Sequence, residues 1–283
     1  MLLSIAVLVS VLMTSVQAEN PFRHHQYKPG EVLNYSYEDT DTIFSAIRRD
    51  GTIQAGDSLL VQEIKIPVKI EILSGKNALE RNLTILPLAE YRQSAPAALA
   101  DSPFKALIGL AKNLPRSFSY SYKDDTEALD HLQAIFEKVR KDEVGKFLFF
   151  KMQDIHQMQE SVEKIPEGIV PGGTKFSSRH ERKGLGGDFV AAPVQVIYQG
   201  VEILDGVKCG YFKAISMGHE FTSGTMKTLT NFFFTLHVAL NGRRQGLMLL
   251  GEGQETATVF KESEKEHFEP QVVLQRQFSI RLQ

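Results

Sequence analysis

The sequence has 283 residues, a formal net charge of −2 at pH 7 and a single cysteine, Cys209. The near-neutral charge gives no electrostatic reason to expect a nucleic-acid partner, because phosphate binding shows as a basic patch or a high isoelectric point. One cysteine excludes an internal disulfide, and the apolar neighbours of Cys209 predict a buried, unreactive thiol.

Residues 1–18 have the pattern of an export signal. The apolar run Leu2–Met13 is too short for a membrane-spanning helix, which needs roughly 20 apolar residues, and Ala18 ends a stretch suited to cleavage. No Lys or Arg precedes the run, and a buried N-terminal strand is the alternative interpretation. We expect the remaining chain, residues 19–283, to be periplasmic or secreted and to form a single β-rich domain.

A polar arm precedes the first expected strand. It covers residues 19–28 and contains the adjacent histidines His24 and His25, which we expect to be solvated because no second cluster of metal ligands lies nearby. Further along the chain, Asp50-Gly51 separates two strand-like runs and therefore predicts a tight hairpin turn.

Strict alternation indicates a strand over residues 64–72. Its Ile and Val side chains fall on one face, whereas Lys, Glu and Pro fall on the other, so the segment fits a half-buried strand. Pro67 lacks the N–H that a sheet hydrogen bond needs. It therefore predicts an edge position or a β-bulge.

The middle of the chain predicts a helical insertion at about residues 100–141. Residues 103–114 carry apolar side chains at helical spacing. Residues 124–141 combine an apolar stripe with acidic residues at the start and basic residues at the end, which match the helix dipole. Residues 146–155 fit either a helix or a strand, and their aromatic content favours a strand.

Two further hairpin signals lie in the C-terminal half. Asp205-Gly206 and Asn241-Gly242 stand between apolar runs, and both dipeptides tolerate the positive φ angles of a type I′ turn. A last alternating strand, residues 272–283, carries apolar side chains on one face, with Arg276 as the exception.

The order of these elements predicts the fold class. Roughly nine to twelve strands surround two helices. We therefore expect an α+β fold that is mainly antiparallel β, with a curved sheet or half-barrel and two covering helices.

The sequence contains no Gly-x-Ser-x-Gly elbow, no His-Glu-x-x-His and no phosphate-binding loop. Asp154 and His156 would share one face of a strand and, with His237, could form a metal or acid–base site if the three converged. Glu252 and Glu255 are a candidate pair for glycoside cleavage, although the neighbouring glycines are typical of a β-bulge. We predict a non-enzymatic protein without catalytic residues, metal or cofactor.

The strongest positive signal is an apolar hairpin at residues 232–250. Its arms are apolar on both faces, so both faces must be covered, whereas a sheet with one wet face alternates. One face would pack on the helices. The other would pack on a second sheet wall, as a dry core, or on an apolar ligand in a cavity. The candidate ligand-lining residues are Phe232, Phe234, Leu236, Val238, Leu247 and Leu249.

Residues 198–212, with Gly200, Glu202, Gly206 and Cys209, resemble the paired strands of periplasmic lipoprotein carriers of the LolA/LppX type. This resemblance implies a β half-barrel that shelters an acyl chain, with helices on its concave side. The chain departs from the lipid-anchored members because it lacks a cysteine at the expected cleavage point. No lipid-contacting residue of that family can be placed on this sequence.

Three hypotheses follow for the function. The first is an exported, non-enzymatic protein that binds a lipid or another apolar ligand in a cavity of the curved sheet, with peripheral association with the cell envelope. The alternative is a structural or interaction module of the envelope with a dry β core, which binds a partner through loops such as residues 168–173 and 183–187. A hydrolase or metal enzyme built on Asp154, His156 and His237 is the third.

Overall fold

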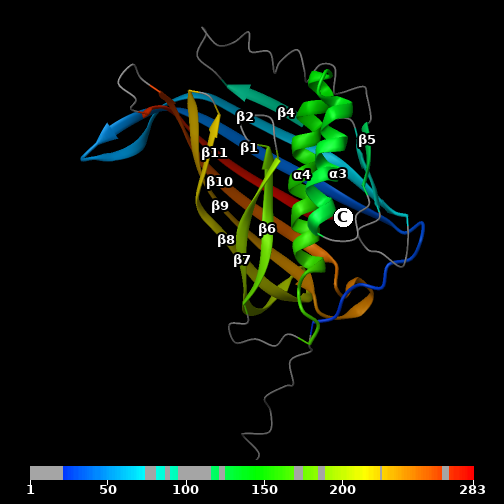
Figure 1. Ribbon diagram of the computed structural model, residues 1–283. Helices are drawn as coiled ribbons and strands as arrows, with labels where there is room; N and C mark the ends of the chain where they lie inside the picture. Colours follow the sequence, from blue (N-terminus) through cyan, green and yellow to red (C-terminus); the bar gives the residue numbers. More distant parts are fainter. Residues whose placement is uncertain are drawn as a thin grey trace, which may run out of the picture.

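The computed structural model of the protein combines one large antiparallel sheet with two helices (Figure 1). The helices are α3 (Asp125–Val139) and α4 (Glu143–Glu163). The α+β class with a curved sheet and two helices, as predicted from the sequence, is confirmed. The structure describes residues 22–73, 81–86, 90–94, 116–120, 125–168, 175–183, 189–223, 225–262 and 268–283.

Within these residues the sheet has 11 strands in the order β5-β3-β2-β1-β11-β10-β9-β8-β7-β6, and β4 pairs with β2 beside β3. The first strand thus pairs with the last, and every pairing is antiparallel. The strands are β1 (Val32–Arg49), β2 (Thr52–Ile72), β3 (Arg81–Ile85), β4 (Glu90–Ser94), β5 (Arg116–Tyr120), β6 (Lys175–Lys183), β7 (Phe189–Leu204), β8 (Val207–Ser223), β9 (Met226–Ala239), β10 (Met248–Glu262) and β11 (Phe268–Leu282).

Two of the three predicted tight turns are confirmed. Asp50 and Gly51 join β1 to β2 with φ angles of 49° and 75°, and Asp205 and Gly206 join β7 to β8 with φ angles of 49° and 78°. Positive φ at both central residues is the signature of a type I′ turn, whose twist matches that of the strands.

The third predicted turn is wrong. Asn241 is extended, with φ of −149°, and is followed by a short 3-10 helix, Gly242–Arg244. The strand pairing ends at Ala239, whose N–H donates to the Leu247 carbonyl at 3.0 Å. Asn241 therefore lies beyond the paired residues. A longer loop therefore joins β9 to β10.

The alternating strand predicted at residues 64–72 is the second half of β2. Its five Ile and Val side chains are all buried. Pro67 is not at a sheet edge, because β2 has neighbours on both sides. Its carbonyl oxygen accepts a hydrogen bond from Leu86 N. In an antiparallel sheet the backbone nitrogen and carbonyl of one residue face the same neighbouring strand, so the nitrogen of Pro67 also points to this side. The missing N–H therefore falls in the gap between the end of β3 and the start of β4, beyond the last residue pair of β2 and β3.

Residues 146–155 are helical rather than a strand, which corrects the interpretation from their aromatic content. They form the first half of α4, which Asp142 caps by accepting a hydrogen bond from Val144 N at 3.1 Å. Almost every residue of α4 is buried, so no polar face reveals the helical period in the sequence. The helix predicted at residues 124–141 is confirmed as α3. The predicted helix at residues 103–114 lies outside the described residues.

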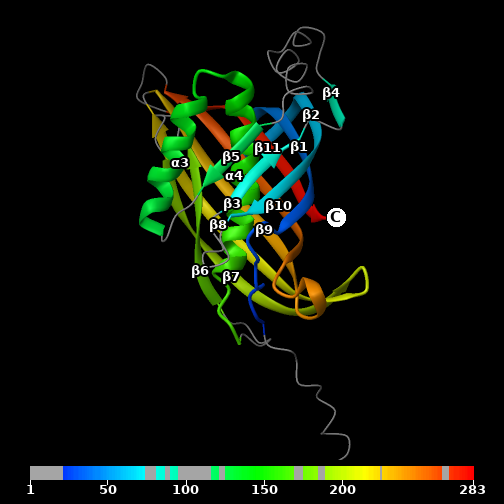
Figure 2. The same ribbon diagram turned by 90° about the vertical axis from the view of Figure 1, so that its right-hand side faces the viewer.

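The sheet curves around α4. Figures 1 and 2 show α4 on the concave side of the sheet, with β3 and β5 on one flank of the helix and β6 and β7 on the other. α4 contacts β3, β5, β6, β9 and β10, whereas α3 packs on α4 and β7. In the described part of the chain, no helix is long and apolar enough to cross a membrane.

The described start of the chain is not a solvated arm, in contrast to the expectation for residues 19–28. Phe22 is fully buried, with its ring edge against Phe212 of β8 at 6.4 Å, and its carbonyl accepts a hydrogen bond from Gly168 N. His25 bonds to the Gln245 carbonyl at 3.0 Å and to Glu31 at 2.8 Å. This segment therefore joins the end of α4 to the loop between β9 and β10.

Candidate functional site

The six predicted ligand-lining residues are all buried, but they do not form one set. Five of them, Phe232, Phe234, Leu236, Val238 and Leu247, belong to the main core beneath α4. Leu249 instead packs with Cys209 and Ala239 in a second small core. An irregularity of pairing between Met248 and Leu250 turns Leu249 away from the other five. Whether the five line a ligand stays a prediction.

The inference that both faces of the apolar hairpin are covered holds for the inner face, but on the outer face only for the end near the β9–β10 loop, because Phe233 is half-buried beside the exposed Glu252 and Gln254. α4 covers the concave face, and Leu204, Val207 and Leu282 pack against the small core around Cys209. Cys209 is fully buried, and burial raises the pKa of its thiol to about 11. The thiol is therefore protonated at neutral pH and unreactive, because the thiolate is the nucleophile.

α4 lies directly on the concave face of the sheet. All residues from Lys151 to Val162 are buried. At Gly251 of β10 the approach is close, because a Cβ at that position would overlap the sulfur of Met158 and the Met158 side chain would have to shift. Helix and sheet are thus packed against each other, and apolar side chains fill the space between them.

A cluster of buried charges joins α4 to the centre of the sheet. We call it the ionic latch, and it consists of Tyr37 and Asp39 of β1, Lys151 and Asp154 of α4, and Arg276 of β11. Arg276 Nε bonds to both carboxylate oxygens of Asp39 at 3.1 Å, and Nη1 bonds to Asp154 Oδ1 at 3.2 Å. Lys151 also contacts Asp39, and Tyr37 donates to Asp154 Oδ2 at 2.9 Å.

Electrostatics keep the latch ionised. Burial would raise the pKa of Asp39, but the positive charges of Arg276 and Lys151 outweigh it and hold that pKa well below its usual range. Burial also disfavours the charged guanidinium, yet Asp154 and Asp39 raise the pKa of Arg276 well above its ordinary value. Burial raises the pKa of Tyr37 well above its ordinary value, so its hydroxyl stays protonated and donates.

The two cations of the latch are matched by more than two carboxylates. Arg276 and Asp39 come from the sheet and Lys151 and Asp154 from α4. Half-buried Asp41 of β1 lies 3.4 Å from both Lys151 and Arg276, and it adds negative charge on the sheet side. Buried ion pairs contribute little net stability compared with apolar residues of equal volume, but removal of one partner is costly. The latch therefore specifies where α4 sits rather than how strongly it is held.

α4 carries further polar residues in the interior. Gln157, Gln159, Glu160 and Ser161 are buried, as is Gln153. Both polar atoms of the Gln153 amide lack a hydrogen-bond partner among the described residues. A buried polar group without a partner costs about 1–3 kcal/mol. α4 is therefore more polar than is typical of a helix that is buried in an apolar core.

The proposed cluster of Asp154, His156 and His237 does not form. Asp154 and His156 lie on a helix, where positions two apart face different directions, and His156 approaches Glu160 instead, at 3.9 Å. His237 lies on the outer face of the sheet, where its Nε2 is 2.9 Å from Glu202 Oε2. Among the described residues, no group of three His, Cys, Asp or Glu is placed to hold a metal ion.

Glu252 and Glu255 do not face each other across a cleft. They lie on opposite faces of β10, since Glu252 is exposed on the outer face and Glu255 Oε2 lies 3.8 Å from Arg276 Nη1 inside. The geometry of a glycosidase carboxylate pair is therefore not present.

The ionic latch was only partly visible in the sequence. Arg276 is a charge on the apolar face of an alternating strand, and Asp39 breaks the same pattern after Leu33, Tyr35 and Tyr37. A charged side chain on the buried face of a strand needs a partner, so these two positions predict a buried ionic contact. Lys151 gives no such signal, because the aromatic residues around it favour a strand in the sequence.

The sequence matches no family model, and no curated protein matches it. The resemblance to carriers of the LolA/LppX type therefore stays a prediction, supported by the strand pattern of residues 198–212 alone.

Proposed function

We propose that this protein is an exported, non-enzymatic binding protein that shelters a lipid or another apolar ligand between the concave face of the sheet and α4. In this proposal α4 is a plug that occupies the site when no ligand is bound. The observation that supports it most strongly is the polar character of a fully buried helix. A helix that stays in a core permanently is typically apolar on all sides.

The polar residues of α4 lower the cost of its exposure. When the helix moves away from the sheet, water hydrates Gln153, Gln157 and Gln159, whereas exposure of an equally long apolar helix would be strongly unfavourable. The apolar wall that α4 leaves behind contains Phe232, Phe234 and Leu236, which suit an acyl chain.

The ionic latch is compatible with such a movement. On separation, Arg276 and Asp39 stay together on neighbouring strands, and Lys151 and Asp154 leave together on the helix. Arg276 also keeps Asp41, which lies 3.4 Å away on the same sheet, so the guanidinium is not left unpaired on the apolar wall. This matters because an unpaired buried charge costs several kcal/mol.

A reversible disulfide tests the movement of α4. Gly251→Cys and Met158→Cys are introduced into a Cys209→Ala background, because a Cβ at position 251 would point at the side chain of residue 158. A fluorescent C16 fatty acid is then titrated against the reduced and the oxidised protein. We expect micromolar binding to the reduced form and at least tenfold weaker binding to the oxidised form.

The matched control is a disulfide that leaves α4 free. Thr42→Cys and Gln275→Cys link the paired strands β1 and β11 in the same background. Oxidation of this control should not change fatty-acid binding. Binding that is equal in both redox states of the α4 variant, or absent from its reduced form, contradicts the proposal.

The second candidate function is an interaction module with a solid core. The tight fit of Met158 against Gly251 favours it, because the closed form leaves no space between helix and sheet at that point. The loops expected to bind a partner lie outside the described residues, apart from Gly168 and Lys183. For this function, solvent extraction of the purified protein followed by mass spectrometry should yield no stoichiometric lipid, and loop deletion should abolish capture of an envelope partner.

Export is tested separately. The predicted signal at residues 1–18 lies outside the described residues. N-terminal sequencing of the protein recovered from the periplasm or medium should begin at Glu19, and an unprocessed N-terminus would contradict export through this signal.

A further inference from the structure

The face of the sheet opposite α4 carries a groove that the proposed function does not use. Strand register places Glu38, Ser279, Glu252, Thr235 and Lys213 in one row that crosses β1, β11, β10, β9 and β8. Short side chains at Ser279 and Thr235 alternate with long ones, so the row is hollowed. The groove, which we call the outer groove, has a volume of about 420 Å³.

A second row runs beside the first across the same strands. It consists of Thr40, Gln277, Gln254 and Phe233, on β1, β11, β10 and β9. Both rows line the outer groove. No hydrogen bond or ion pair within the described part of the chain involves the side chains of Gln254, Gln277 or Glu252. These amides and this carboxylate are therefore available to a ligand.

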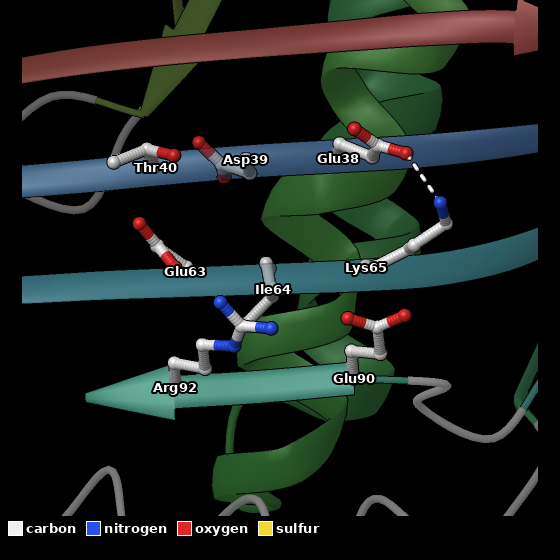
Figure 3. Close-up of a pocket in the computed structure, with 8 residues that line it drawn as sticks. All are labelled: Glu38, Asp39, Thr40, Glu63, Ile64, Lys65, Glu90 and Arg92. Atoms are coloured by element: carbon white, nitrogen blue, oxygen red, sulfur yellow. Dashed lines mark ion pairs between the residues drawn. The ribbon is translucent and has the colours of Figure 1, made fainter.

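The groove continues over β2 and β4. There a hollow of about 220 Å³ shares Glu38 and Thr40 with the outer groove. Figure 3 shows the side chains of this end, with Glu38 and Lys65 joined as an ion pair of 2.6 Å. The two hollows form one track along the rows. Seven strands spaced by about 4.8 Å give it a length on the order of 30 Å.

Thr235 is the most informative residue of the groove. It is only 6% exposed, and its Oγ1 is buried without a hydrogen-bond partner among the described residues. Buried hydroxyls in proteins are normally paired. Because Thr235 lines the outer groove, a rotation of its side chain toward the groove would let a ligand supply the missing partner.

Aromatic rings complete the groove. Phe233 and Tyr211 both line it. Tyr211 is held in place from two sides, because it stacks on His237 at 4.9 Å and Lys213 lies over its ring at 5.6 Å. A fixed aromatic face beside amide and hydroxyl groups suits a ligand that is apolar on one side and rich in hydroxyls on its edges.

Extended peptides and polyanions fit the outer groove less well. An extended peptide binds at a sheet edge, where free backbone groups can pair with it, whereas the outer groove lies over strands that are already paired on both sides. A polyanion is disfavoured by Glu252, and Glu38 is already matched by Lys65. The balance of charge and the row of amides favour a neutral ligand.

We propose that the outer groove is a binding site for a neutral oligosaccharide. Gln254, Gln277 and the Thr235 hydroxyl bond to sugar hydroxyls, while Phe233 packs against the apolar face of a ring and Tyr211 borders the groove. The site lies on the opposite side of the sheet from α4, so it does not depend on whether the interior holds an apolar ligand.

Calorimetric titration of the mature full-length protein with neutral oligosaccharides of four to six units tests this site. The panel contains oligomers of glucose, mannose, galactose and N-acetylglucosamine. We expect at least one to bind in the micromolar to millimolar range. Thr235→Val, which keeps the shape of the side chain but removes the hydroxyl, should weaken that binding about tenfold, the effect of losing one ligand hydrogen bond.

Two further variants complete the test. Phe233→Ala should also weaken sugar binding about tenfold or more. Thr258→Val, the same substitution on the outer face of β10 but outside the groove, should leave it unchanged. Thermal melting of each variant shows that the fold is kept, and Thr235→Val should melt no lower than the original protein. Absence of binding to the whole panel, or binding that Thr235→Val leaves unaffected, overturns the proposal.

Discussion

Arg276 shows how a single residue can decide where a helix lies. Its guanidinium reaches two carboxylates that are 115 positions apart in the sequence, Asp39 and Asp154, and its side chain is almost fully buried. The guanidinium group is suited to this role because its planar fork of donors can engage two carboxylates at once and cannot be deprotonated in a protein. The inward position of Arg276 thus connects β1, β11 and α4.

Substitution of Arg276 tests this connection. Arg276→Met keeps the apolar stem but leaves Asp39 and Asp154 in the interior with Lys151 as the remaining buried cation, so we expect the free energy of unfolding to fall by about 3–5 kcal/mol. Urea denaturation measures the change. The control is Arg281→Met on the same strand, whose ion pair with Asp205 is exposed. That variant should lose about 0–1 kcal/mol, and equal losses in both variants would contradict the role of the latch.

The pKa of Asp39 predicts a specific pH dependence. Because this pKa is lowered in the folded protein, the contribution of Asp39 to stability is fully present above the unfolded pKa of about 3.9 and is lost as the pH falls below it. Urea unfolding at several pH values between 6 and 2 should show a steeper loss below pH 4 for the original protein than for Asp39→Asn. Parallel curves for the two proteins would show that Asp39 is not held ionised by the latch.

At the scale of the element, α4 depends on a well-defined N-terminus. Asp142 accepts a hydrogen bond from Val144 N at 3.1 Å and also pairs with Arg116 of β5 at 3.0 Å. Asp142→Ala should lower the free energy of unfolding by about 1–2 kcal/mol, because a helix N–H loses its cap. Asp142→Asn keeps a capping oxygen and loses only a partly exposed ion pair, so chemical denaturation should show a smaller loss. A larger loss in the Asn variant would assign the main role to Arg116.

The same element shows why part of the fold could be predicted and part could not. The amphipathic stripe of α3 and the alternation of β2 and β11 are local patterns that report which face is buried. α4 is buried on all sides, so its polar and apolar residues do not separate onto two faces. Its aromatic run was therefore interpreted as a strand, and the site built on Asp154 and His156 was wrong for the same reason.

On the scale of the whole molecule, the two ends of the described chain close the structure. β1 pairs with β11 from Tyr35 opposite Leu282 to Ser45 opposite Val272. Phe22 lies against β8, and its carbonyl bonds to Gly168 just after α4. The interior is thus complete only when segments from both ends of the chain are in place.

The anchoring of the N-terminal segment leads to a further prediction. Phe22→Ala removes a fully buried ring from the core and should lower the free energy of unfolding by about 3–5 kcal/mol. Arg23→Ala, at the exposed next position, should change it by less than about 0.5 kcal/mol. Denaturation of both variants, monitored by circular dichroism, measures the difference. A small effect of Phe22→Ala would mean that the segment is only loosely attached.

The sequence alone determined the strands with a two-residue turn and the faces they bury, since turn geometry and alternation depend on neighbours along the chain. It also indicated that both sides of the apolar hairpin must be covered, which is correct for the inner side but not for the outer side at Phe233. Only the tertiary structure decided that α4 provides the cover, that Arg276 meets Asp39 and Asp154, and that a row of polar side chains crosses five strands on the outer face. Each of these depends on the register between segments far apart in the chain, and no local pattern specifies that register.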